Sequence, residues 1–241
     1  MSEQGNTSQH GRFFGVGVGP GDPELLTVKA SKLLQRVPVI CVRQSEPERG
    51  NYALDVVQDL LDDARQEVLR LALPADSSLE TTRAWRNAGE AIVERLRRGQ
   101  DVAFITEGDP MLYSTFSHLL ETVLLAEPGV PVEVIPGVSS VMAAAASSGV
   151  PLVTHGQRLA ILPAVYGIDD LREAITNYDT IVLMEVNRTL IDALANLEKL
   201  GLAGKAIYVR RATTLREEVV QDIHQLSEED FDYFSLLIIK R

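Results

Sequence analysis

The chain has 241 residues, 45% of them hydrophobic and 24% charged, which suffices for one large globular domain or two small ones. A net charge of −11 disfavours nonspecific binding to nucleic acid, whose phosphates require a basic surface. The single cysteine, Cys41, excludes an internal disulfide, and no uncharged apolar run reaches the roughly 18 residues that span a bilayer. These features predict a cytoplasmic protein, with residues 1–11 as a polar, flexible tail.

Buried strands and helical patterns alternate regularly along the first part of the chain. Apolar residues recur at helical spacing between the strands, as in Leu26, Ala30 and Leu33. Such alternation predicts a mainly parallel five-stranded sheet with helices on both faces. The expected strands cover residues 13–18, 37–42, 67–73, 102–105 and 132–135.

The sequence Gly149-Val150-Pro151 interrupts this alternation and predicts a domain boundary. We expect an N-terminal α/β domain over residues 12–148 and a C-terminal α/β domain over residues 149–241. Helices are fewer in the second domain, with one expected over residues 190–197, and this predicts a mixed sheet. Its strands are expected at residues 159–163, 180–186, 206–210, 219–226 and 234–240.

Three strand-to-helix turns in the first part have unusual sequences. Residues 15–23 read GVGVGPGDP, residues 107–110 read EGDP, and residues 136–140 read PGVSS. Glycine lets the backbone turn tightly and approach a ligand closely. Any one of these turns alone is typical of an ordinary helix start. In a parallel sheet all three lie at the carboxyl edge, where ligands bind, so together they predict a small-ligand site.

The sequence lacks the motifs of several common sites, namely those that bind dinucleotides, phosphates or metals and those that hold a serine nucleophile. The dinucleotide pattern G-x-G-x-x-G fails at Pro20 and Asp22, and the second strand ends at Arg43 instead of an acid, so a dehydrogenase is disfavoured. A phosphate-binding Gly-Lys-Ser/Thr loop and a G-x-S-x-G nucleophile turn do not occur. The 4 histidines are scattered, so the sequence predicts no metal site.

The same turns resemble those of the tetrapyrrole methylases. The resemblance rests on GVGPGDPELLT (17–27), TEGDPMLYST (106–115), IPGVSS (135–140), Leu183-Met184 and Arg211-Ala212-Thr213, and it extends from Phe13 to the end of the chain. It implies two α/β domains that bind S-adenosylmethionine in the cleft between them. It also implies methylation of a tetrapyrrole at C20 of precorrin-2 or its cobalt form, on the route to cobalamin. A homodimer is implied by the resemblance alone.

The resemblance also assigns the positions that bind the methyl donor. S-adenosylmethionine carries no phosphate, so it requires backbone groups, small hydroxyls and an apolar slot, and its cationic sulfonium is compatible with an acidic protein. The family positions fall here on Pro20, Gly108, Asp109, Met111, Ser114, Thr115, Ser139, Ser140, Met184 and Ala212.

The expected reaction is direct displacement of the methyl group by an electron-rich ring carbon, with the protein aligning carbon, methyl and sulfur. Tyr113 is the candidate for proton transfer, whereas Glu107 is expected to serve a structural role. The substrate is a polycarboxylate, so arginines that follow strands of the second domain are candidates to bind it. These are Arg188, Arg210 and Arg211.

Two other functions stay open from the sequence. A sister methylase would share the methyl-donor site and act on another position or substrate, such as uroporphyrinogen III or diphthine. A nonenzymatic tetrapyrrole-binding protein would bind the macrocycle without methyl transfer. Product analysis separates all of these functions.

Overall fold

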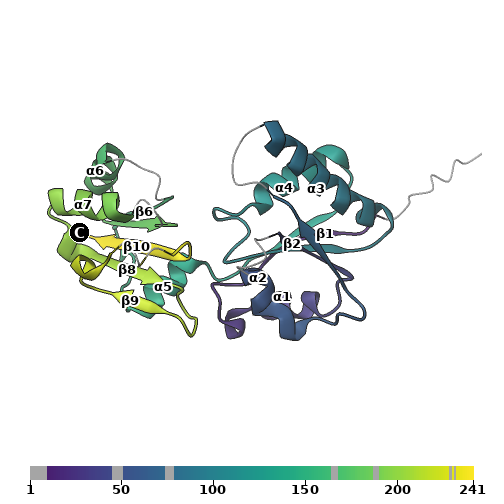
Figure 1. Ribbon diagram of the computed structural model, residues 1–241, viewed down its shortest axis with the longest axis horizontal. Coiled ribbons are helices and arrows are strands. Elements are labelled where there is room, and N and C mark those ends of the chain that lie inside the picture. The colour runs from purple at the N-terminus through teal and green to yellow at the C-terminus, as the bar shows by residue number, and fades with distance from the viewer. Residues whose placement is uncertain are drawn as a thin grey trace, which may run out of the picture. The chain divides into compact units, whose positions relative to one another are not determined.

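A computed structural model divides the chain into two compact units, Met1–Val138 and Ser139–Arg241 (Figure 1). It describes residues 10–44, 51–73, 79–163, 168–186, 190–227, 230 and 232–241. The division falls before Ser139, whereas the sequence predicted it before Gly149. The reason is helix α5 (Ser140–Ser148), which packs against strands of the second unit. Within the described residues, no helix is both long and apolar enough to cross a membrane.

The first unit is built on a five-stranded sheet in the order β3-β2-β4-β1-β5. Every strand pair in it is parallel, which confirms the predicted sheet. The strands are β1 (Phe13–Gly17), β2 (Val39–Arg43), β3 (Glu67–Leu71), β4 (Val102–Thr106) and β5 (Val132–Ile135). The helices are α1 (Val28–Leu34), α2 (Tyr52–Val57), α3 (Leu79–Arg97) and α4 (Phe116–Ala126), with 3-10 turns η1 (Pro23–Leu25) and η2 (Gln58–Leu60).

Both faces of this sheet are buried at its centre, where β1 and β4 consist of uncharged residues that are buried throughout. One face packs against α3 and α4, and the other against α1 and α2. On the first face Phe116 of α4 covers Gly15, where an added Cβ would lie 2.3 Å from its Cζ atom. Cys41 belongs to this core with no exposed surface, and burial raises the pKa of its thiol. Cys41 therefore packs as a small buried hydrophobic residue.

The second unit contains a mixed sheet in the order β6-β7-β10-β8-β9. Only β6 and β7 pair in parallel, and the other pairs are antiparallel, as predicted for this unit. The strands are β6 (Leu159–Pro163), β7 (Thr180–Met184), β8 (Ala206–Arg210), β9 (Glu218–Val220) and β10 (Ser235–Lys240). Besides α5, the helices are α6 (Ile168–Asn177) and α7 (Leu190–Lys199), with 3-10 turns η3 (Ala203–Lys205) and η4 (Ile223–Gln225).

Two elements of the second unit differ from the sequence predictions. The strand expected over 219–226 is wrong beyond Val220, because Asp222 caps the 3-10 turn η4 with a bond from the His224 N–H (3.2 Å). Helix α6 was not predicted, although Leu171 and Ala174 are buried at helical spacing on it.

Candidate active site

The three glycine-rich turns meet at one edge of the first sheet. Strands β1 and β4 are neighbours, but the chain leaves β1 through α1 on one face and β4 through α4 on the other. Where neighbouring parallel strands connect to helices on opposite faces, a crevice opens beyond the carboxyl ends of the strands, and α/β proteins bind ligands there.

The turns after β1 and β4 are bonded directly to each other. The Gly19 N–H donates to the Gly108 carbonyl (3.3 Å), and the Gly108 N–H donates to the Gly19 carbonyl (2.8 Å). Both residues are left-handed, with φ of 82° and 63°, which glycine adopts without strain. Two segments far apart in sequence thereby form one continuous backbone edge.

Asp109 ties the third turn to the second. One carboxylate oxygen, Oδ2, accepts from the Gly137 N–H (3.0 Å), and the other, Oδ1, accepts from the Met111 N–H (2.9 Å). The backbones approach so closely that a Cβ on Gly137 would lie 2.1 Å from the Gly108 carbonyl oxygen. A Cβ on Gly17 would lie 2.5 Å from the same oxygen. The centre of this edge therefore consists of backbone that carries no side chains. We call this part, formed by Gly17, Gly19, Gly108 and Gly137, the glycine edge.

The first turn is fixed by local caps and by one distant side chain. Asp22 Oδ1 accepts from the Glu24 N–H (2.9 Å), and Thr27 Oγ1 accepts from the Ala30 N–H (3.1 Å) to begin α1. The Tyr52 hydroxyl of α2 donates to the carbonyl of buried Pro20 (2.9 Å). Sequence reasoning missed Tyr52, because nothing in its local pattern indicates a partner in the first turn.

The turn between β4 and α4 combines a fixed base with an exposed tip. Ser114 Oγ donates to Thr106 Oγ1 (3.0 Å) and accepts from the Phe116 N–H (3.2 Å). Thr115 precedes the first residue of α4. Met111 and Tyr113 are 63% and 52% exposed, and Tyr113 is held at a φ of 49°. This turn therefore displays two large, apolar-bodied side chains beside the glycine edge.

The second unit contains the remaining positions that the sequence predicts to bind the methyl donor, S-adenosylmethionine. Ser139 caps α5 through a bond from the Met142 N–H (3.4 Å), and Ser140 is the first residue of that helix. Met184 ends β7, and buried Ala212 follows β8. The hydroxyl of neighbouring Thr213 is buried and has no hydrogen-bond partner among the described residues. A buried polar atom of this kind is suited to a ligand contact.

The predicted substrate arginines are placed as follows. Arg188 lies outside the described residues. Arg211 Nε contacts Asp232 Oδ2 (2.5 Å), and its guanidinium lies 5.7 Å from the centre of the Phe234 ring. Arg210 forms ion pairs with Glu218 and Asp230. A role for Arg211 in binding substrate stays a prediction, and its present partner is an acid of its own unit.

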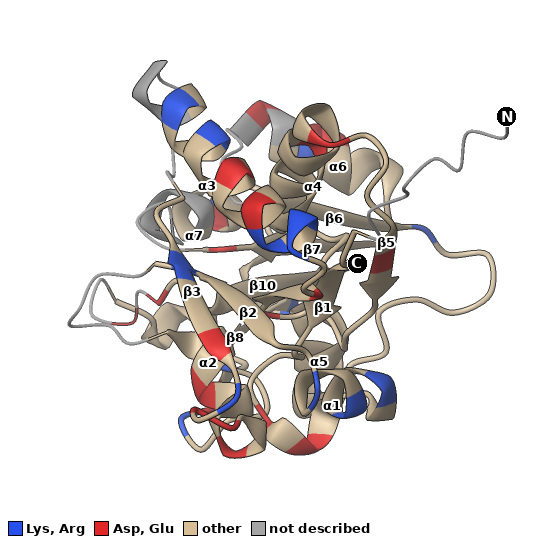
Figure 2. Cartoon of the chain, turned by 90° about the vertical axis from the view of Figure 1, so that its right-hand side faces the viewer, with Lys and Arg blue, Asp and Glu red and all other residues tan. Residues whose placement is uncertain are grey.

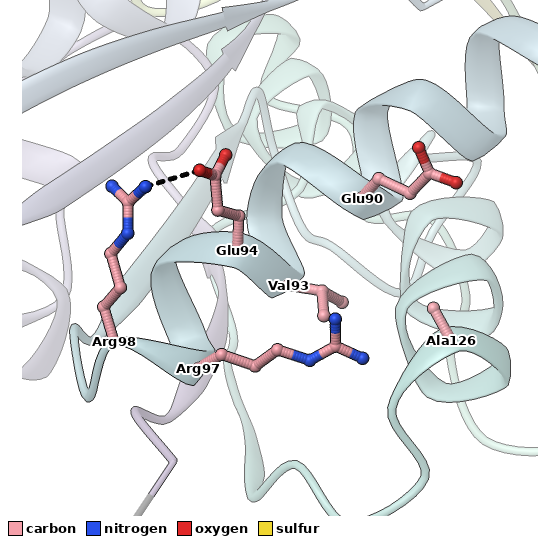
Figure 3. A pocket seen from close by; sticks show the side chains of 6 residues that line it. All are labelled: Glu90, Val93, Glu94, Arg97, Arg98 and Ala126. Carbon is pink, nitrogen blue, oxygen red and sulfur yellow. Dashed lines mark hydrogen bonds and ion pairs between the residues drawn. The ribbon is translucent and has the colours of Figure 1, made fainter.

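A separate hollow lies on the outer surface of α3 and α4 (Figure 3). Figure 2 shows both acidic and basic residues on α3, and at the hollow Arg98 pairs with Glu94 (2.5 Å) and Arg97 with Glu127 (2.7 Å). Arg97 ends α3 just before the chain enters β4, so this hollow lies toward the amino edge of the sheet, away from the three turns. The hollow is therefore distinct from the candidate site, and its arginines Arg97 and Arg98 are already paired with glutamates.

The fold and the glycine edge define an α/β protein that binds a small ligand at a switch point of its sheet. The family model of the tetrapyrrole (corrin/porphyrin) methylases matches residues 12–226. The chain therefore belongs to the tetrapyrrole methylase family, and it is an S-adenosylmethionine-dependent methyltransferase by fold and family.

Individual relatives match nearly the whole chain. A probable cobalt-precorrin-2 C(20)-methyltransferase of Methanocaldococcus jannaschii is 38% identical over 95% of this chain and 96% of the relative. A precorrin-2 C(20)-methyltransferase of Sinorhizobium is 33% identical, with 95% of each chain covered. Among solved structures, uroporphyrin-III C-methyltransferase of Thermus thermophilus in complex with S-adenosylhomocysteine is 28% identical, with a TM-score of 0.68 over 95% of this chain and 92% of that one.

Proposed function

We propose that the protein transfers a methyl group from S-adenosylmethionine to C20 of precorrin-2 or cobalt-precorrin-2 in cobalamin biosynthesis. The observation that carries methyl transfer is the backbone edge at which Gly19, Gly108 and Gly137 come together. The choice of C20 is supported by the two relatives of that name, which match over nearly their whole length.

The residues at this edge fit the chemistry of the methyl donor. S-adenosylmethionine supplies an electrophilic methyl group on a cationic sulfur. Backbone N–H and carbonyl groups, hydroxyls and exposed Met111 suit its uncharged adenosine and its methionine part, and the orphan Thr213 hydroxyl adds a polar group in the second unit. We propose the following residues for donor binding: Pro20, Gly108, Met111, Ser114, Thr115, Ser139, Ser140, Met184 and Ala212. Asp109 belongs to the same set, and we propose that it acts by holding Gly137 and Met111 in place.

Tyr113 is our candidate for the proton transfer that accompanies methylation. Its left-handed backbone and exposed side chain present the hydroxyl at the tip of the β4–α4 turn. We expect Tyr113→Phe to lower kcat on the order of 10²-fold, as loss of a general acid or base does, while the Kd for S-adenosylhomocysteine stays the same. Single-turnover methyl transfer and calorimetry measure the two quantities. Full turnover by Tyr113→Phe would exclude a proton-transfer role for its hydroxyl.

The function is tested by incubating the purified protein with S-adenosylmethionine and either precorrin-2 or cobalt-precorrin-2. Mass spectrometry should show the gain of one methyl group, and NMR should locate it at C20. Methylation elsewhere, or of uroporphyrinogen III instead, would reassign the protein to a sister methylase. Binding of the macrocycle with no methyl transfer would indicate a nonenzymatic binding protein, and no binding of S-adenosylhomocysteine would contradict methyl transfer altogether.

The cellular setting and assembly form part of the same proposal. A cytoplasmic location is supported by Cys41, a reduced thiol buried in the core, and by the chemistry of the proposed donor. A homodimer is supported by the family resemblance. Light scattering that gives the mass of one chain, 26.4 kDa, would contradict the dimer.

A further inference from the structure

Left-handed backbone conformations gather at one edge of the second sheet. Glu185 follows β7 with a φ of 56°, and Arg211 and Thr213 follow β8 with φ of 48° and 69°. Side chains with a Cβ rarely adopt this region, and such residues persist where surrounding contacts hold them. Strands β7 and β8 both pair antiparallel with β10, so their carboxyl ends share an edge. These strained turns flank Met184 and Ala212, two of the positions in this unit that are proposed to bind the methyl donor.

The segment that leads into β10 holds the turn after β7. The Tyr233 hydroxyl donates to Glu185 Oε1 (2.9 Å), and Ser235 Oγ donates to the Val186 carbonyl (3.0 Å). Tyr233 is 51% exposed, so its hydroxyl contributes little to the core, and its bond instead fixes the carboxylate of a strained residue.

The same segment holds the turn after β8. Asp232 Oδ2 accepts from Arg211 Nε (2.5 Å), and the Arg211 backbone N–H donates to the Phe234 carbonyl (2.8 Å). Asp232 is itself oriented, because its Oδ1 accepts from the Phe234 N–H (2.9 Å). A charge-assisted bond at a partly buried site is stronger than a neutral one, so it can hold an unfavourable backbone conformation.

We propose that Tyr233 and Asp232 are positioning residues for the methyl donor: through Glu185 and Arg211 they hold the two left-handed turns that carry Met184 and Ala212. This inference rests on the proposed function, because it takes these turns as part of the donor site. It gives Arg211 a role within its own unit, in place of a contact with substrate carboxylates.

A matched pair of substitutions at Glu185 separates backbone conformation from charge. Glu185→Ala removes the acceptor of Tyr233 and keeps the unfavourable left-handed backbone, whereas Glu185→Gly removes the same acceptor and adopts that backbone freely. We expect Glu185→Ala to raise the Kd for S-adenosylhomocysteine about tenfold and Glu185→Gly to stay within about threefold of the wild type. Isothermal calorimetry on the full chain measures both. Equal effects of the two variants, including no effect of either, would overturn the positioning role.

Two further comparisons test the same role: whether a second substitution restores S-adenosylhomocysteine binding, and whether a variant changes the Kd for S-adenosylhomocysteine or the KM for the tetrapyrrole. Tyr233→Phe should weaken S-adenosylhomocysteine binding as Glu185→Ala does, and adding Glu185→Gly should restore it. Asp232→Asn should raise the Kd for S-adenosylhomocysteine and leave the KM for the tetrapyrrole unchanged; the opposite split would return Arg211 to the substrate site and overturn its positioning role. Tyr178→Phe, near the other edge of the same sheet, is the control and should change neither constant.

Different results would contradict donor binding by the protein and the positioning role of Tyr233 and Asp232. A wild-type protein that binds no S-adenosylhomocysteine contradicts the proposed function, and the positioning role falls with it. A wild type that binds, with Tyr233→Phe and Glu185→Ala variants that bind equally well, overturns the positioning role alone. Thermal unfolding of each variant shows whether it is folded, and the Glu185 pair decides the question if Tyr233→Phe does not fold.

Discussion

Gly137→Ala is expected to weaken binding of S-adenosylhomocysteine by at least about 100-fold, close to 2.7 kcal/mol. The added Cβ would lie 2.1 Å from the Gly108 carbonyl oxygen and 2.9 Å from the Gly17 Cα. Both neighbours are backbone atoms, so no side-chain rotation relieves the overlap and the turns must move apart. Because the same displacement breaks the bond from Gly137 to Asp109, the midpoint of thermal unfolding should fall as well.

The control for this substitution lies at the other end of strand β5. Gly129 has no heavy atom within 4 Å of an added Cβ. Gly129→Ala should therefore bind S-adenosylhomocysteine like the wild type. Calorimetry and thermal unfolding on both variants complete the comparison, and wild-type affinity in Gly137→Ala would contradict the close-packed edge.

Asp109→Asn is expected to weaken binding of S-adenosylhomocysteine nearly as much as Asp109→Ala, between about 10-fold and 100-fold. The carboxylate accepts from two backbone donors, Gly137 N–H and Met111 N–H, with one oxygen each. Asparagine has one acceptor oxygen and one donor NH₂ group, so in either orientation it sets a donor against a donor. A hydrogen bond to a charged group contributes about 1.5–3 kcal/mol, which sets the size of the effect.

Asp22→Asn is the matched control for Asp109. Asp22 Oδ1 accepts from the Glu24 N–H alone among the bonds described for its side chain, and asparagine caps such a turn equally well. Its affinity should therefore stay near that of the wild type. If Asp109→Asn retains affinity while Asp109→Ala loses it, Asp109 does not hold both turns through two accepted bonds.

The first unit could be predicted closely from the sequence because its strands lie in a parallel sheet buried on both faces. Its central strands β1 and β4 are uncharged, mostly apolar runs that are buried throughout, and each strand of the sheet is followed by a helix with its own period. The second unit was harder to predict. A mixed sheet gives no regular alternation, so the short amphipathic helix α6 was missed and the stretch after Val220 was assigned to a strand.

The position of the candidate site could also be predicted, but its internal bonds could not. Glycine-rich turns after parallel strands indicate an edge, and the structure brings the turns of Gly19, Gly108 and Gly137 together there. The partners of these turns depend on tertiary contacts that leave no local pattern. Tyr52 reaches Pro20 from another helix, and Asp232 reaches Arg211 from the segment before the last strand.

The bonded glycines at the end of β1 and β4 have a consequence for folding. The edge exists only after the segments around Gly19 and Gly108 have paired, and the turn of Gly137 is added once β5 has joined β1. Pairing between segments distant in sequence is slow, because the intervening chain loses entropy before the contact forms. Recovery of ligand binding during refolding should therefore lag behind the return of helical signal, so that S-adenosylhomocysteine serves as a kinetic probe for completion of the first sheet.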